Sequence, residues 1–547
     1  MIPIRRLIAC AAAGWLAAAS PSHADQGPVV DAPAGAVQGR SQGELNVFKG
    51  LPYASPPVGP ARWKPPTPPP PWSGVRDATR FGPACFQPRQ TLGGVYASPI
   101  PAMSEDCLSL NIWAPKTAHG APVLVWIHGG SLSTGASSEA MYDGARLAAH
   151  GLVVVSINYR LGVLGYLAHP GLSAESPLGI SGNYGLLDQI EALRWVQRNI
   201  GAFGGDPANV TIAGESAGGL SVMYLMAAPA ARGLFAKAIA ESAYMVSTPE
   251  LKVGRFGASS AEASGLDLAA QLHAPDIAAL RAMDPGALTN AAAAARFAPF
   301  GAVDGKILPR QLVDVFDRGE QAPVPVLAGF NSGEIRSLTV LLPPEPATRA
   351  RYEALIRDRY GDLADAFLRL YPGADVHESM LATTRDALYG WTAERLVRKQ
   401  AALGQPAYLY VFDHGVPQAD AAGLHAFHAS EVPYVFGTLA RTPPNWPKAP
   451  PTTLEARLSE AMTSYWSSFA RTGQPTAAGG PDWPAYAPNA AFIVFQDTPL
   501  VWHDLLPGMY ELHEAAMCRR RAAADLAWNW NVGVASPPLP PPSAGCR

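Results

Sequence analysis

The feature that most constrains the fold of this chain is a Gly-x-Ser-x-Gly pentapeptide, residues 214–218, centred on Ser216. A mostly apolar run, 210–213, leads into it, and apolar residues at helical spacing follow from 220 to 226. This order predicts a strand, a sharp turn and a helix, the arrangement called a nucleophile elbow. Glycines at both ends of the pentapeptide leave room where the strand and the helix cross. The alternative is a glycine-rich turn with an incidental serine, so partners for Ser216 must be sought elsewhere in the chain.

Composition limits the classes of protein to consider. With 547 residues the chain can bury a large core, and its 48% hydrophobic content is that of a soluble globular protein. Only 16% of residues are charged and the formal net charge is −3, with no basic stripe and no block of like charge. These values argue against a nucleic-acid partner and against a disordered charged tail.

The N-terminus has the pattern of a secretory signal peptide. Arg5 and Arg6 precede an apolar run, 7–19, and a small residue, Ala24, ends the segment where a signal peptidase would cut. Residues 7–10 superficially resemble a lipoprotein box, but almost no apolar stretch precedes Cys10. We therefore predict a signal peptide over 1–24 and a secreted or periplasmic protein. The apolar run is too short to span a bilayer, so we expect no stable membrane anchor.

Cysteine usage agrees with an oxidising destination. Removal of the signal peptide leaves four cysteines, Cys85, Cys107, Cys518 and Cys546, which allow three pairings. The pairs Cys85–Cys107 and Cys518–Cys546 close the shortest loops and are the expected ones, with free buried thiols as the alternative. No Cys-x-x-Cys spacing occurs, which argues against a zinc site, and no metal is expected.

Strand patterns alternate with helix patterns along most of the chain, which indicates an α/β protein. Continuous β-branched runs are typical of strands buried on both faces of a parallel sheet. The expected core strands are 108–113, 123–127, 152–157, 210–213, 324–329 and 407–412, with short strands of a wrapping N-terminal sheet within 46–82. Helices are expected at 186–200 and 454–470. The predicted fold is a mostly parallel central sheet flanked by helices.

Three further helical stretches, 258–272, 349–370 and 378–403, interrupt the strand alternation. We interpret them as insertions, at about 246–320 and 340–403, that cap the sheet edge and shape access to a site. No repeat and no long linker divides the chain. We therefore expect one domain over 25–535 and a proline-rich tail over 536–547.

Candidate partners for Ser216 occur in three further segments of the chain. His128-Gly129-Gly130-Ser131 comes after strand 123–127, where backbone N–H groups could point at an oxyanion. Glu334 comes just past strand 324–329, and His428 lies in the segment 423–431. His425, His428 and Glu431 could instead suggest a metal cluster, but no His-Glu-x-x-His or other zinc signature is present. The order serine, acid, histidine is that of an α/β-hydrolase triad.

Several longer motifs make the chain after the signal peptide resemble, nearly end to end, the type-B carboxylesterase/lipase family of carboxylesterases and cholinesterases. The motifs are Gly50-Leu51-Pro52-Tyr53-Ala54, Glu105-Asp106-Cys107-Leu108 with Asn111-Ile112-Trp113, Asn183-Tyr184-Gly185-Leu186-Leu187-Asp188-Gln189, Gly204-Gly205-Asp206-Pro207, and the pentapeptide itself. The resemblance implies the α/β-hydrolase fold with helical capping insertions. It points to a secreted carboxylesterase of the bacterial type.

The resemblance also implies roles for individual residues. Ser216 would be the acylated nucleophile, His428 the general base and then acid, and Glu334 the carboxylate that orients the imidazole. The oxyanion hole would use the N–H groups of Gly130, Ser131 and Ala217; Ser242 would hydrogen-bond near the triad, and Cys85 would pair with Cys107.

The chain departs from the family pattern at three places. Ser131 stands where the family has a third glycine; the backbone N–H is kept, but the side chain would narrow the pocket for bulky alcohols. Ile335 follows Glu334 where glycine is usual. No tryptophan precedes Glu105 where cholinesterases hold choline, which weakens a cholinesterase interpretation.

The sequence therefore predicts a secreted serine carboxylesterase that hydrolyses a small-molecule ester through an acyl-enzyme, without a cofactor, as a monomer or weak homo-oligomer. The alternatives are a non-catalytic binding or adhesion protein on the same fold, and the same triad used on carbamates or amides. Binding proteins of that kind lose the nucleophile or a partner, whereas this chain keeps all three.

Overall fold

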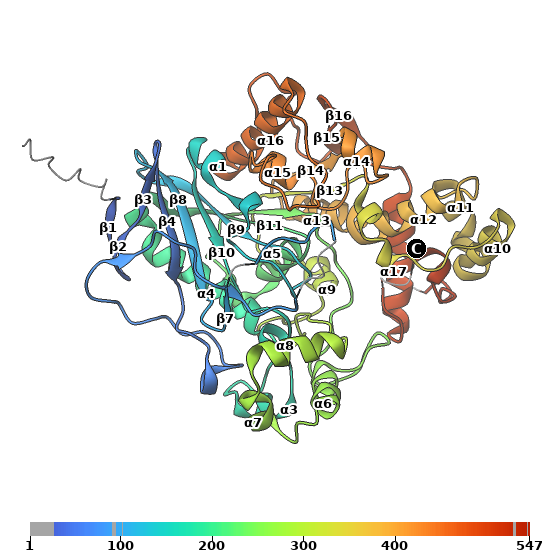
Figure 1. Cartoon of the computed structure of the whole chain (residues 1–547). Coiled ribbons are helices and arrows are strands. Elements are labelled where there is room, and N and C mark those ends of the chain that lie inside the picture. The colour runs from blue at the N-terminus through green and yellow to red at the C-terminus, as the bar shows by residue number, and fades with distance from the viewer. Residues whose placement is uncertain (1–26, 90–93, 101, 529–531, 544, 547) are drawn as a thin grey trace, which may run out of the picture.

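An 11-stranded sheet, in the order β16-β15-β14-β13-β12-β11-β9-β10-β8-β4-β3, runs through the centre of the computed structural model (Figure 1). The structure describes residues 27–89, 94–100, 102–528, 532–543 and 545–546, so the predicted signal peptide lies outside the described residues. The strands of this sheet are β3 (Arg40–Gln42), β4 (Leu45–Pro52), β8 (Ser109–Pro115), β9 (Ala121–Ile127), β10 (Val153–Ile157), β11 (Gly205–Glu215), β12 (Lys237–Glu241), β13 (Val326–Asn331), β14 (Ala407–Phe412), β15 (Ala491–Phe495) and β16 (Pro499–His503).

Neighbouring strands from β10 through β9 and β11 to β15 are all parallel. The flanking strands β8, β4, β3 and β16 pair antiparallel with their neighbours. Two small sheets accompany the N-terminal part, one of β1 (Val29–Ala32), β2 (Gly35–Gln38) and β5 (Arg76–Asp77), the other of β6 (Ala84–Cys85) and β7 (Met103–Ser104). The predicted α/β fold with a mostly parallel central sheet is confirmed.

Helices cover both faces of the sheet. Successive apolar side chains of its strands point to opposite faces, and each face packs into its own hydrophobic core. In β9, Val125 belongs to one hydrophobic cluster, while Leu124 and Trp126 belong to the other. The first cluster includes side chains of α4 (Tyr184–Asn199), α5 (Ala217–Ala227), α9 (Leu312–Asp317) and α13 (Trp391–Ala402), and the second includes those of α1 (Ala145–Ala149), α15 (Val432–Val435) and α16 (Thr453–Thr472). This double burial is what the continuous apolar runs predicted.

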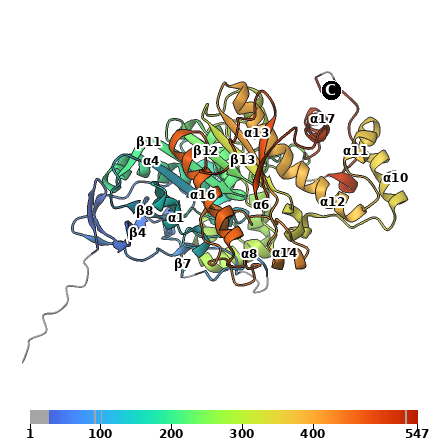
Figure 2. The same ribbon diagram turned by 90° about the horizontal axis from the view of Figure 1, so that it is seen from above.

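Two groups of helices lie beyond the sheet. One contains α6 (Ala261–Gln271), α7 (Ile277–Ala282) and α8 (Pro285–Ala294), which pack with α3 (Pro170–Glu175) and α2 (Gly162–Tyr166). The other contains α10 (Arg349–Tyr360), α11 (Ala364–Leu370) and α12 (Val376–Arg385), and lies beside α17 (Met509–Ala523) at one end of the molecule (Figures 1 and 2).

The predicted helices 349–370 and 378–403 are each interrupted. Gly361, at φ +53°, separates α10 from α11, and a π-helical turn, Asp386–Gly390, joins α12 to α13. The sequence placed α13 among the helices at the sheet edge, but it packs directly on β13 and β14, the two strands that it connects. Residues 391–402 therefore cover the sheet as an ordinary crossover helix.

Both expected disulfides form, Cys85–Cys107 and Cys518–Cys546. The alternative of free thiols is excluded for these four cysteines. The second disulfide attaches the proline-rich tail to α17, and the N–H of Leu539 donates to the carbonyl of Arg359 at 2.8 Å. The tail is therefore held against the α10–α12 group. Among the described helices, none combines the length and apolar character needed to cross a membrane.

Candidate active site

The sharp turn between β11 and α5 carries Ser216. Its backbone has φ 57° and ψ −121°, a strained conformation for a residue with a side chain. The turn is closely packed: a Cβ added to Gly218 would lie 2.1 Å from the carbonyl oxygen of Ile127, and one added to Gly214 would lie 2.6 Å from the backbone of Gly218. The N–H of Ser216 donates to the carbonyl of Glu241 in β12 at 2.9 Å. Packing against two neighbouring strands therefore holds the predicted elbow in place.

Glu334 and His428 meet beside this turn. Glu334 begins the 3₁₀ turn that follows β13 and is fully buried. Its Oε2 bonds to Nδ1 of His428, and its Oε1 accepts the N–H of Asn331 at 2.9 Å. The N–H of Gly333 donates to the carbonyl of Ala426 at 2.9 Å, which joins the two loops that carry the pair. The structure thus brings together the three residues predicted at 216, 334 and 428.

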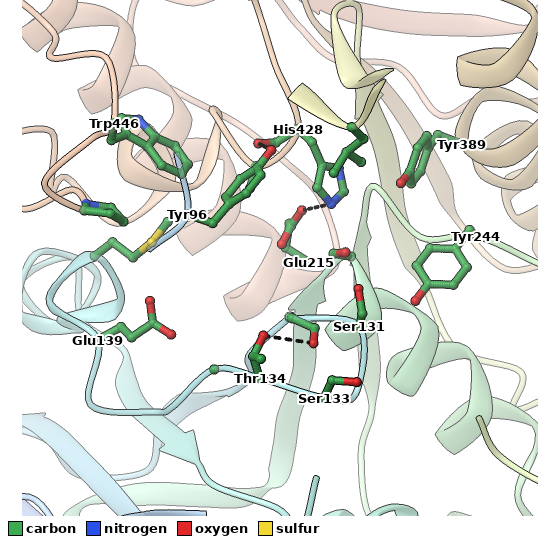
Figure 3. A pocket seen from close by; sticks show the side chains of 18 of the residues that line it. Tyr96, Ser131, Ser133, Thr134, Glu139, Glu215, Tyr244, Tyr389, His428 and Trp446 are labelled. Carbon is green, nitrogen blue, oxygen red and sulfur yellow. Dashed lines mark hydrogen bonds and ion pairs between the residues drawn. The ribbon is translucent and has the colours of Figure 1, made fainter. Parts of the chain in front are cut away.

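The second nitrogen of His428 contacts a residue that the sequence analysis overlooked. Nε2 lies 3.1 Å from Oε1 of Glu215, the residue before Ser216 (Figure 3). Among the described residues, no hydrogen bond joins Nε2 to the Ser216 hydroxyl. The imidazole therefore lies between two carboxyl groups, those of Glu215 and Glu334. A carboxylate next to the nucleophile within the pentapeptide was the signal that could have identified Glu215.

The pKa values of His428, Glu215 and Glu431 are all raised. Burial alone would lower the pKa of the His428 imidazole, but the nearby charges of Glu215 and Glu334 outweigh burial and raise it. Burial raises the pKa of the Glu215 carboxyl, and also that of Glu431, which accepts a hydrogen bond from Asn331 at 2.6 Å. The site therefore stabilises a protonated imidazole, the charge state that a general base reaches after taking a proton.

A loop after β9 supplies backbone donors on the other side of Ser216. Gly130 has φ 101° and Ser131 has φ 55°. The carbonyl of Gly130 accepts the N–H groups of Ser133 and Thr134, both at 2.9 Å, while in the described chain no hydrogen bond is made by the N–H of Gly130 or Ser131. Ala217 is the first residue of α5, where N–H groups lack an intrahelical partner. Gly130 and Ser131 line the same cavity as Ser216, and Ala217 follows Ser216 directly in the chain.

Two other residues were named in the sequence analysis: Ser242, which was expected to hydrogen-bond near the triad, and His425, the other histidine of the segment 423–431. Ser242 is fully buried and its N–H donates to the carbonyl of Gly329 at 2.8 Å, but its hydroxyl has no hydrogen-bond partner among the described residues. His425 bonds to Asp413 and Asp420 and lies outside the cavity that holds His428. Within the described residues, no group of three His, Cys, Asp or Glu side chains is arranged to hold a metal ion.

Ser216 and His428 line a cavity of about 450 Å³. Its walls are mainly aromatic and aliphatic, and the other lining residues are Tyr96, Gly129, Gly130, Ser131, Ser133, Thr134, Gly135, Glu139, Met141, Tyr142, Glu215, Tyr244, Leu338, Val340, Leu341, Leu388, Tyr389, Ala429, Pro443 and Trp446 (Figure 3). A concave, mostly apolar site with a few polar groups is typical of small-molecule pockets. Tyr96 was not identified from the sequence because it lies in an irregular loop that carries no motif.

The elbow serine, the histidine–glutamate pair and the mostly parallel sheet define the class of α/β-hydrolases. Comparison with known proteins agrees, since the model of the carboxylesterase family matches residues 26–500. Fumonisin B1 esterase of Sphingopyxis macrogoltabida is 39% identical over 478 residues, which cover 84% of this chain and 85% of that protein. Para-nitrobenzyl esterase of Bacillus subtilis is 38% identical over 460 residues, covering 83% and 91%.

A solved structure of a PNB esterase superimposes with a TM-score of 0.77 at 34% identity and covers 88% of this chain and 99% of that one. The chain belongs to the carboxylesterase family, a family of serine hydrolases that act on carboxylic esters. Relatives of similar identity are named for different substrates, among them a cocaine esterase of Homo sapiens at 34%. Family membership therefore establishes the class of reaction and leaves the substrate open.

Proposed function

We propose that this chain is a secreted serine carboxylesterase in which Ser216, His428 and Glu334 form the catalytic triad. The observation that carries the proposal is the meeting of a buried His428–Glu334 pair with a strained elbow serine in one cavity. The proposed oxyanion donors support it, since Gly130 and Ser131 line that cavity and Ala217 follows the serine. Each of these parts has a defined task in acyl transfer.

The reaction would run through an acyl-enzyme. The Ser216 hydroxyl attacks the ester carbonyl while Nε2 of His428 takes its proton, which requires the imidazole to exchange its contact with Glu215 for one with the serine. The N–H groups of Gly130, Ser131 and Ala217 stabilise the oxyanion. His428 then protonates the leaving alkoxide, and a water molecule that it deprotonates releases the acid.

A covalent probe tests this assignment. We expect a fluorophosphonate to label the wild-type protein once per chain, and peptide mass spectrometry to place the label on Ser216, because only an activated serine reacts quickly with such a probe. The same preparation should hydrolyse para-nitrophenyl butyrate and lose that activity in step with labelling. Hydrolysis that survives full labelling, or a label on another residue, would contradict the triad.

Glu215→Gln should shift the pH dependence of the reaction. A charged imidazole cannot accept the serine proton, so kcat/KM falls as the pH drops through the raised pKa of His428. Removal of the Glu215 charge lowers that pKa and extends activity to lower pH, by about one pH unit. The measurement is kcat/KM between pH 5 and 10, with the exposed Glu44→Gln as control. An acid limb that stays in place would show that Glu215 does not act on His428.

Export is the remaining part of the proposal. Two disulfides support it, because they form and persist in oxidising compartments. A basic pair followed by an apolar run and Ala24 in the sequence supports it independently. Expression of the full chain should yield a mature protein that begins at Asp25, and N-terminal sequencing of the exported product checks the cleavage site.

A further inference from the structure

A charged pair at the end of α12 contacts the turn that leads to the carboxyl group of the proposed triad. Arg385 is the last residue of α12, and its Nη1 donates to the carbonyl of Ser332 at 3.1 Å, two residues before Glu334. Its Nε donates to Oδ1 of Asp386 at 2.7 Å. Among the described residues, those that line the active-site cavity do not include Arg385. The guanidinium therefore acts on the turn that carries Glu334 without facing the substrate.

The carboxyl group of Asp386 holds this guanidinium in one position. Asp386 begins the π-helical turn and is buried, and its Oδ2 accepts the hydroxyl of Tyr371 at 3.0 Å. The Tyr371 oxygen lies 2.9 Å from Nε2 of His513 in α17. Because the tyrosine proton goes to Asp386, Nε2 of His513 is the donor in that contact, and burial keeps the imidazole neutral by lowering its pKa to about 4. Both oxygens of Asp386 thus have a donor.

Ser332 is held through both of its backbone polar groups. Its N–H donates to the carbonyl of Phe412 in β14 at 2.9 Å, and its carbonyl accepts from Arg385. Because Glu334 lies only two residues further on, a shift of Ser332 would move the Glu334 carboxyl group away from Nδ1 of His428. A displacement of about 1 Å in a catalytic group can cost about 100-fold in rate.

Arg385 also places positive charge near Glu334. Burial opposes the charged guanidinium, but the charge of Asp386 outweighs burial and that of Glu334 adds to it, so the pKa of Arg385 is raised. The interaction is mutual, since the cation attracts the Glu334 carboxylate and repels a positive charge on His428. The described cavity lining itself contains no lysine or arginine, so this charge comes from outside the cavity.

We propose that Arg385 is a positioning residue of the triad, which holds the turn that carries Glu334 and provides a fixed positive charge beside that carboxylate. This inference rests on the proposed ester hydrolysis. It adds a residue that belongs to none of the motifs behind the family resemblance. Because Arg385 does not face the cavity, its role should be visible in kcat and in the pH dependence, and not in KM.

The pH dependence is a measurement that a purely structural role would leave unchanged. The charged and titratable groups around Arg385 are Asp386, Glu334 and Tyr371, and those around His428 are Glu215, Glu334, Glu431, Tyr96 and Tyr389. Loss of the cation leaves the carboxyl groups around His428 less opposed, so the pKa of His428 rises further. Only the neutral imidazole accepts the serine proton, and the acid limb of kcat/KM therefore moves to higher pH.

Arg385→Gln removes the charge and keeps a side-chain N–H donor. We expect kcat for para-nitrophenyl butyrate to fall about tenfold, KM to change by less than about twofold, and the acid limb to rise by about half a pH unit. Arg385→Lys keeps the charge, so its acid limb should stay at the wild-type position. Arg349→Gln makes the same chemical change at an exposed arginine of α10 and should keep all three wild-type values.

The outcomes separate this role from the proposed function. No hydrolysis by the wild type would overturn the proposed function. An acid limb that stays in place in Arg385→Gln, or moves equally in Arg385→Lys, would overturn only the role of Arg385. If Arg385→Gln does not fold, Asp386→Asn decides. Asparagine has the shape of aspartate and leaves the cation without its negative partner, so the acid limb should move to lower pH; a limb that stays or rises would contradict the proposal.

Discussion

Ser216→Ala should lower kcat for para-nitrophenyl butyrate by about 10⁴-fold or more, the loss expected when a triad nucleophile is removed. The alanine keeps the backbone N–H that bonds to Glu241 and removes only the hydroxyl oxygen, so the thermal unfolding temperature should stay close to that of the wild type. Steady-state kinetics on freshly purified protein, with unfolding followed by circular dichroism, measure both quantities. Retention of more than a few per cent of the wild-type rate would remove Ser216 from the mechanism.

Two histidines in one segment provide the matched comparison for this result. His428→Gln should lose activity to a similar extent as Ser216→Ala, because general-base removal also stops the attack. His425→Gln should retain it, since His425 bonds to Asp413 and Asp420 outside the cavity. Equal losses in the two histidine variants would indicate damage to the segment rather than to the triad.

The placement of Ser216 and Glu334 at one edge of the sheet could be predicted from the sequence because each follows a strand of one parallel sheet. Carboxyl ends of parallel strands lie at the same edge, so Ser216 after β11 and Glu334 after β13 share that edge. The apolar runs that become β9 and β10 were recognisable because both of their faces are buried. The family resemblance then selected His428 over His425, because the residues from His428 to Gly437 match the family pattern.

Other parts of the molecule carried too little local signal. β12 is short, with alanines inside and a charged residue at each end, so its sequence lacks the β-branched run typical of a core strand; only its place between β11 and β13 makes it one. The contact between Glu215 and His428 joins residues more than 200 positions apart and depends on how the elbow turns. Tyr96 reaches the cavity from an irregular loop through two hydrogen bonds that no periodicity encodes.

Gly218→Ala should be the most damaging single methyl group that can be added at the elbow. Its Cβ would lie 2.1 Å from the carbonyl oxygen of Ile127, and that oxygen belongs to a central strand of the sheet that cannot move aside. Forcing a methyl group into such packing typically costs about 1–3 kcal/mol or more. The displaced helix start would also move the N–H of Ala217 away from the oxyanion. We therefore expect a fall of several degrees in the unfolding temperature and at least a 100-fold fall in kcat.

Gly201→Ala separates this steric effect from the general effect of replacing glycine. Gly201 is exposed, and a Cβ there would meet no atom within 4 Å, so alanine should leave kcat unchanged and stability equal or slightly higher. Differential scanning calorimetry and ester kinetics on both variants complete the comparison. If Gly218→Ala retained wild-type kcat, the added methyl group would not have displaced a required oxyanion donor, and the expected link between the packing of the turn and the reaction would be wrong. The Gly218→Ala variant thus tests, through one methyl group, whether the packing of the turn also sets the geometry of the reaction at Ser216.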